Sequence, residues 1–269
     1  MHICLSEATT MPAPFAEDVG ACVAAGVPAL EAWLTKLEKH LESHSVDDTR
    51  RLLAEKGVRL VAAAYQGGLL LSQGEQRKAH FADFRRRLEL CQGFEIRTML
   101  VVADFVRAVD ATALERAVVS LKQAGQWAAG FGVRLALEFR AGETFCASLD
   151  TAVRLVAAAC ERNVGVCLDT FHFFTGPSKE ADLDLLTPQN LFWVQASDLA
   201  GVPRELATDA DRVLPGDGDL PLDFLLGKLR ERGYDGFVSL ELMNPTLWQT
   251  KASQVAELGA AALRRVLPR

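Results

Sequence analysis

One phrase recurs along this chain: a helical stretch ends at a glycine, and a short apolar run follows at once. It reads AAGVPALEAW from residue 24, EKGVRLVAAA from residue 55, GFGVRLALEF from residue 130 and ERGYDGFVSLEL from residue 231. A glycine is a common stop directly after a helix, because it adopts the left-handed conformation without strain. An uninterrupted apolar run is typical of a parallel strand covered on both faces. The phrase therefore predicts strands and helices that alternate.

The same pattern indicates where the elements lie. We expect strands at residues 2–5, 29–33, 59–64, 98–102, 134–139, 165–168, 191–196 and 237–242. We expect helices at residues 15–25, 45–56, 75–91, 111–130, 148–162, 222–232 and 250–266. Eight units in 269 residues come to roughly 34 residues each, which suits one (β/α)8 barrel.

We therefore predict an α/β fold, a (β/α)8 TIM barrel that forms a single domain over residues 1–269. The alternative is a doubly wound open sheet, which would carry a glycine-rich fingerprint after its first strand. The segment CLSEATTMPAP at that place contains no glycine, so the barrel is favoured.

The composition excludes some classes of partner. The net charge is −6 and the isoelectric point about 5.5, whereas non-specific binding of nucleic acid needs a basic surface. The apolar runs are shorter than the roughly 18 residues of a membrane span, and the start lacks the pattern of a signal peptide. The six cysteines form no C-x-x-C pair and read as mostly buried, reduced thiols. We expect a cytoplasmic protein with no nucleic-acid or membrane partner.

Polar residues end four successive predicted strands. In a barrel of this kind, functional side chains lie at the C-terminal ends of the strands. The residues at these ends are Glu138, Asp169 with His172 close behind, Gln195 with Asp198, and Glu241 with Asn244. Three carboxylates share a dry pocket only if a cation or protons compensate them. Oxygen ligands at this density suit a divalent ion such as Mn²⁺ or Mg²⁺.

Each residue also has a structural interpretation. Glu138 can pair with Arg140, Asp169 can cap the turn that follows it, and His172 can pack beneath the loop FHFFTGP. The basic stretch EQRKAHFADFRRRLE, residues 75–89, reads as a solvated helix face. Among the aromatic residues, Trp193 is expected in the core, while Phe171 or Trp248 is a candidate to line a substrate pocket.

At these residues the chain resembles the sugar phosphate isomerase/epimerase superfamily, the xylose isomerase-like TIM barrels. The phrases that carry the resemblance are LALEF, VGVCLDTFHFF, WVQASD, DRVLPGDGDLPL and GYDGFVSLEL. The resemblance covers nearly the whole chain and is sharpest from about residue 130 onward. It implies a divalent metal held by Glu138, Asp169, Gln195 and Glu241. It also implies that Glu138 and Glu241 move protons on opposite faces of the substrate, and that His172 and Arg212 hold substrate oxygens.

The sequence departs from the family pattern at residue 195, where the family usually has histidine. Glutamine offers a neutral amide oxygen, so among Mn, Mg, Co and Zn a harder ion than zinc is favoured. The apurinic endonucleases of the family need further histidines. Val213 and Gln66 stand where two of them are expected, which argues against a role in DNA repair.

The resemblance implies a metal-dependent isomerase or epimerase of a small sugar, keto-sugar or cyclitol, which works by proton transfer through an enediolate. Two alternatives stay open: a keto-sugar or inosose dehydratase on the same site, and a metal-free sugar-binding barrel. The expected partner is a small sugar or polyol. A homo-oligomer is possible, and the helix face at residues 81–90 is a candidate contact.

Overall fold

The computed structural model describes residues 1–268 and contains a closed barrel of parallel strands. The strand order around the barrel is β1-β10-β7-β6-β5-β4-β3-β2. These strands are β1 (His2–Ser6), β2 (Ala29–Trp33), β3 (Arg59–Gln66), β4 (Thr98–Val102), β5 (Arg134–Glu138), β6 (Val164–Asp169), β7 (Leu191–Ala196) and β10 (Phe237–Leu240). The predicted (β/α)8 barrel is confirmed, and each predicted strand lies within two residues of an observed one. The domain bounds of 1–269 stay a prediction.

Helices follow the strands as predicted. They are α1 (Phe15–Ala25), α2 (Leu34–Leu41), α3 (Val46–Lys56), α4 (Gly74–Gly93), α5 (Ala111–Ala129), α6 (Leu149–Ala159), α7 (Thr170–Thr175), α8 (Leu222–Glu231) and α9 (Ala252–Val266). The sequence analysis missed α2 and α7. Helix α2 follows β2 without a connecting loop and without a side-chain cap, and α7 has only six residues.

Shorter elements occupy the loops. The strands β8 (Asp198–Leu199) and β9 (Arg212–Val213) pair as a small antiparallel ribbon. The 3₁₀ helices are η1 (Glu7–Thr10), η2 (Glu180–Leu185), η3 (Arg204–Leu206), η4 (Asp209–Asp211) and η5 (Leu247–Gln249).

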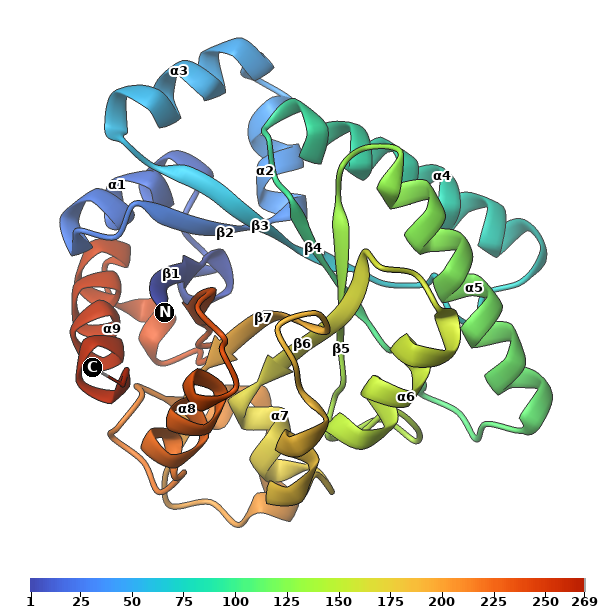
Figure 1. Ribbon diagram of the computed structural model, residues 1–269. Coiled ribbons are helices and arrows are strands. Elements are labelled where there is room, and N and C mark those ends of the chain that lie inside the picture. The colour runs from blue at the N-terminus through green and yellow to red at the C-terminus, as the bar shows by residue number, and fades with distance from the viewer. Residues whose placement is uncertain (269) are drawn as a thin grey trace. The chain divides into compact units, whose positions relative to one another are not determined.

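The chain divides into two compact units. The first comprises residues 1–63 and 194–269 and the second residues 64–193. In the first unit β1 pairs with β2 and with β10, and helices α1 and α9 lie side by side (Figure 1). Gly259 of α9 lies against Leu240 of β10 so closely that a Cβ atom at residue 259 would overlap the leucine side chain.

In the second unit β4, β5 and β6 are neighbours, and the register aligns Val102 with Glu138 and Glu138 with Cys167. Helices α5 and α6 pack together on this part of the sheet. The solvated-face interpretation holds for Arg85 and Arg86 of α4, whose side chains are more than half exposed. It is wrong for Arg77, which stacks on Phe81 and donates to Ser120 and Gln123.

All six cysteines are free thiols, and five of them are buried. Cys160, at the C-terminal end of α6, is the exposed one. Within residues 1–268, every helix is too short or too polar to cross a membrane. The cytoplasmic location stays a prediction.

Candidate functional site

Three predicted site residues of the second unit lie together. Glu138 is the last residue of β5, Asp169 the last residue of β6, and His172 lies in α7 directly after it. Each offers one ligand atom, and these three atoms lie within 4.8 Å of one another. All three residues are buried, with exposed fractions of 7%, 0% and 5%. Two carboxylates and an imidazole at this spacing fit a divalent ion.

Asp169 also starts the helix that carries His172. Its Oδ1 accepts the backbone N–H groups of Phe171, at 2.6 Å, and of His172, at 3.3 Å. The carboxylate therefore caps α7, as one interpretation of the sequence predicted. Because α7 begins directly after Asp169, His172 lies in its first turn, beside the carboxylate that caps the helix. Nε2 of His172 lies 3.6 Å from Oε1 of Glu138. Capping and participation in the cluster are compatible roles.

The first unit holds the other predicted residues. Nε2 of Gln195 donates to Oε1 of Glu241 at 2.9 Å and to Oε1 of Glu31 at 2.9 Å. Gln195 lies on β7 and Glu241 directly follows β10, where Ser239 is the register partner of Gln195. Their exposed fractions are 1% for Gln195, 5% for Glu241 and 0% for Glu31.

Arg212 brings a buried positive charge to Glu241. One edge of its guanidinium donates to Oδ1 of Asp209, from Nε at 3.0 Å and from Nη2 at 2.7 Å. Nη1 donates to Oγ of Ser197 at 3.1 Å and lies 3.6 Å from Oε2 of Glu241. Only 1% of the Arg212 side chain is exposed, so its contacts in this structure are with the protein. The predicted substrate contact of Arg212 stays a prediction.

The motif DRVLPGDGDL forms a loop folded around Asp198. Oδ1 of Asp198 accepts the backbone N–H groups of Leu199 and Leu220, both at 2.9 Å, and Oδ2 accepts that of Gly216 at 2.9 Å. Gly216 has a φ of +83°, and a Cβ atom at Gly218 would overlap the Asp198 carboxylate. The two glycines are therefore needed by the loop, and Asp198 has a structural role that the sequence analysis left undecided.

Glu31 is the functional candidate that the sequence analysis missed. It stands in ALEAW on β2, a phrase of the same form as ALEF around Glu138 and SLEL around Glu241. The available signal was a carboxylate between the apolar residues Leu30 and Ala32 in a buried strand. The predicted metal ligands all come from the ends of the last four strands of the barrel, whereas Glu31 lies on the second.

Two further buried carboxyl groups, Glu7 and Asp18, lie in the first unit close to Lys36. Glu7 accepts the backbone N–H of Trp33 at 2.6 Å through Oε2. Asp18 accepts the hydroxyl of Thr10 at 2.6 Å and pairs with the ammonium of Lys36. Burial raises the pKa of Glu7 well above its usual range, and the neighbouring Asp18 raises it further. Burial also raises the pKa of Asp18, but the ammonium of Lys36 opposes that rise, so Glu7 is the acid of the two that holds its proton more strongly.

The aromatic predictions have different outcomes. Trp193 is in the core, with 1% of its surface exposed, as predicted. Phe171 is also buried and meets the His172 ring edge-on, at 5.5 Å between ring centres. Trp248 lines a cavity of about 210 Å³ and donates its indole N–H to the carbonyl oxygen of Ala8 at 3.0 Å.

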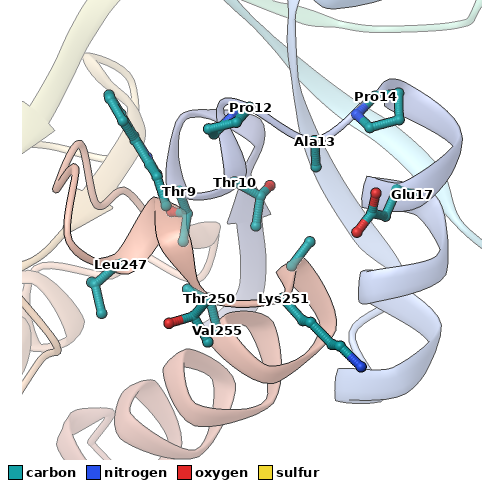
Figure 2. A pocket seen from close by; sticks show the side chains of 12 residues that line it. Thr9, Thr10, Pro12, Ala13, Pro14, Glu17, Leu247, Thr250, Lys251 and Val255 are labelled. Atoms are coloured by element: carbon teal, nitrogen blue, oxygen red, sulfur yellow. The ribbon is translucent and has the colours of Figure 1, made fainter.

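Figure 2 shows this cavity, which belongs to the first unit. Thr9 and Thr10 border it from η1, Glu17 from α1, and Lys251 and Val255 from the start of α9. Its lining thus combines an acid, a base and hydroxyl groups with apolar side chains.

The chain is similar to known proteins over nearly its whole length. The family model described as Xylose isomerase-like TIM barrel matches residues 19–266. An inosose isomerase of Halalkalibacterium halodurans is 27% identical over 263 residues, which cover 94% of this chain and 92% of the relative. An inosose isomerase of Bacillus subtilis is 27% identical over 266 residues, which cover 96% and 94%. The crystal structure of the IOLI protein with a zinc atom has a TM-score of 0.93 and 25% identity, covering 99% of this chain and 98% of that one.

Proposed function

We propose a function from one premise: this chain belongs to the xylose isomerase-like TIM barrel family. It is a sugar isomerase or epimerase, and we assign its substrate to the inososes, which are ketones of inositol. Relatives named inosose isomerase that match 94% or more of the chain support this assignment. The proposed reaction moves the carbonyl group to a neighbouring carbon of the ring.

The observation that carries the proposal is the buried group of Glu138, Asp169 and His172, whose ligand atoms lie within 4.8 Å of one another. Two buried carboxyl groups at this spacing call for a compensating positive charge. Glu138 and Asp169 would hold a divalent ion, and His172 is either a third ligand or a group that orients the substrate beside it. When bound, the ion supplies Lewis-acid polarisation of the substrate carbonyl. The solved structure of IOLI with a zinc atom supports a metal, and the amide at residue 195 favours a harder ion such as Mn²⁺.

The resemblance gives Gln195 and Glu241 as two further ligands, and this assignment stays a prediction. Within the first unit, the hydrogen bonds of Gln195 fix the position of one Glu241 oxygen, and Arg212 lies beside the other. These contacts make Glu241 a carboxylate of defined orientation, which a proton-transfer group requires.

The chain's own residues would carry the protons. One of Glu138 and Glu241 takes the proton from the carbon next to the carbonyl, and the electron pair of that C–H bond enters the enediolate. The other glutamate, which starts protonated, gives its proton to the former carbonyl carbon. The proton of the neighbouring hydroxyl group passes to the former carbonyl oxygen, so the neighbouring carbon becomes the new carbonyl and the two glutamates have exchanged protonation states. Delivery of a proton to the original carbon from the opposite face, by the other glutamate, would give epimerisation instead. His172 and Arg212 are the candidates to orient substrate oxygens.

The test is direct. The purified protein is incubated with an inosose and Mn²⁺ in D₂O, and the mixture is followed by ¹H NMR. We expect a second inosose and deuterium at the carbons that exchange. Absence of both product and exchange with Mn²⁺, Zn²⁺ and Co²⁺ overturns the proposal. Loss of water, seen as an absorbing enone or diketone, would assign the chain to the dehydratases.

A further inference from the structure

The carboxylate of Glu31 is held in one orientation by the strand beside it. Oγ of Ser6 donates to Oε1 of Glu31 at 3.0 Å, and the two residues are register partners on β1 and β2. The Ser6 oxygen accepts the backbone N–H of Ala8 at 3.3 Å, so its own proton is directed to Glu31. Glu31 is 0% exposed.

The same oxygen of Glu31 accepts one of the two N–H groups of Gln195, while Glu241 accepts the other. A carboxylate only accepts hydrogen bonds, and an amide has a donor end and an acceptor end of nearly equal shape. Turning the amide over would place its oxygen against both carboxylates and remove the N–H donor that Glu31 and Glu241 share. The two carboxylates together therefore select one of the two orientations of Gln195.

We infer that Glu31 is a positioning residue, which fixes the amide of Gln195 so that its oxygen, and not its nitrogen, is presented as a ligand. This inference rests on the proposed function, because it concerns a ligand of the proposed ion. It explains how a glutamine serves where the family usually has histidine. An amide without a fixed orientation would present its nitrogen, a donor group that repels a cation, part of the time.

Through Gln195, Glu31 also acts on Glu241. The amide nitrogen bridges the two carboxylates, and Arg212 compensates the charge of Glu241 from its other side, with 3.6 Å between Nη1 and Oε2. Groups that orient metal ligands in this way typically contribute about 10- to 100-fold to metal affinity.

The first experiment needs no metal. The side-chain NH₂ signals of Gln195 are identified in an ¹H–¹⁵N spectrum by their loss in Gln195→Met. We expect Glu31→Leu to shift these signals strongly, because it removes the acceptor and keeps a side chain of similar size. Glu7→Gln is the matched control, since Glu7 is an equally buried carboxyl group that bonds to Trp33 and not to Gln195. Unmoved signals in Glu31→Leu overturn the inference.

The second experiment titrates each purified protein with Mn²⁺ and measures the free ion by EPR. We expect Glu31→Leu to lose about 10- to 100-fold in affinity. Glu31→Gln keeps an acceptor oxygen and should restore most of it, and Glu7→Gln should bind as the wild type does. Should Glu31→Leu fail to fold, Ser6→Ala removes one of the two bonds that pin Glu31 and should give a smaller loss.

The outcomes separate the two claims. Wild-type binding with no loss in Glu31→Leu and Ser6→Ala overturns the positioning role and leaves the proposed function standing. A wild type that binds neither Mn²⁺ nor Zn²⁺ overturns the metal-dependent function, and the role of Glu31 toward a ligand falls with it.

Discussion

Nε2 of His172 lies 3.6 Å from Oε1 of Glu138, and both side chains are at least nine-tenths buried. Two roles are open to His172 at this position: it can bind the ion, or it can hold substrate oxygens beside it. The family resemblance implies four ligands that all offer oxygen: Glu138, Asp169, Gln195 and Glu241. A nitrogen ligand at the ion would therefore be His172. If His172 binds the ion, the Mn²⁺-loaded protein will show the ¹⁴N coupling of an imidazole in pulsed EPR, and His172→Gln will lose it.

The exposed His2 provides the control, because His2→Gln should leave the coupling unchanged. A wild-type protein that binds Mn²⁺ without any ¹⁴N coupling would contradict the ligand role. His172→Gln would then be expected to raise KM, as a residue that holds substrate oxygens should.

The two glutamates proposed for proton transfer give a kinetic prediction. Glu138→Gln and Glu241→Gln keep the shape and the oxygen atom of each side chain and remove its basic group. We expect each variant to lower kcat by about 10²- to 10⁴-fold, the usual contribution of a positioned base. Metal content is measured on the same samples, so that a lost ion is not mistaken for a lost base. Near wild-type turnover in a metal-loaded variant would show that the altered glutamate transfers no proton.

The buried Glu7 gives a prediction about stability and pH. Burial and the neighbouring Asp18 raise its pKa, so the folded protein keeps a proton that the unfolded chain releases near its usual pKa of 4.5. The contribution of Glu7 to the free energy of unfolding therefore has its full value below pH 4.5. Between pH 4.5 and the raised pKa it falls by about 1.4 kcal/mol per pH unit. Glu7→Gln mimics the protonated form and should abolish this fall.

Urea unfolding of both proteins across a pH series measures the effect. The stability of Glu7→Gln relative to the wild type should increase with pH within the window. Glu17→Gln, a change at an exposed position of the same unit, should run parallel to the wild type. Parallel curves for Glu7→Gln would mean that Glu7 is ionised in the folded protein.

Two helical glycines test the packing of helices on the barrel. A Cβ atom at Gly259 of α9 would overlap Leu240, whereas one at Gly227 of α8 meets open space. We expect Gly259→Ala to destabilise by about 1–3 kcal/mol through overpacking. Gly227→Ala should stabilise by about 0.5–1 kcal/mol, since alanine loses less backbone entropy in a helix. Thermal unfolding of both variants decides the matter, and equal effects would contradict the close approach of α9 and β10.

The strands were predictable because each reads as a short apolar run bounded by a glycine or a polar residue. Helix α3 was equally clear, since Ser45 caps it at one end and Gly57 ends it. Helix α7 was not, because its start signal, Asp169, is also the end of a strand and has a second candidate role. A local sequence pattern assigns each residue to one element. Asp169 belongs to two, because it ends β6 and caps α7.

Site residues were predictable where they lie at the ends of neighbouring strands. Glu138, Asp169 and His172 come together because their strands are neighbours, which the order of units along the chain implies. The bond between Gln195 and Glu31 joins residues 164 positions apart. Such a bond depends on side-chain length and direction, which no local motif encodes. Arg212 is similar, since its pairing with Ser197 follows from the folding of the loop around Asp198.

The glutamine at residue 195 provides the last prediction. Gln195→His restores the residue that the family usually has, and an imidazole nitrogen is a better ligand than an amide oxygen for the borderline-soft zinc ion. Glu31 would accept the other N–H of the ring and orient it, as carboxylates do for histidine ligands. We expect competitive titration to show a shift in preference from Mn²⁺ toward Zn²⁺, tenfold for each ~1.4 kcal/mol gained. Gln189→His places a histidine on the surface and controls for adventitious binding. An unchanged preference in Gln195→His would mean that residue 195 does not touch the ion.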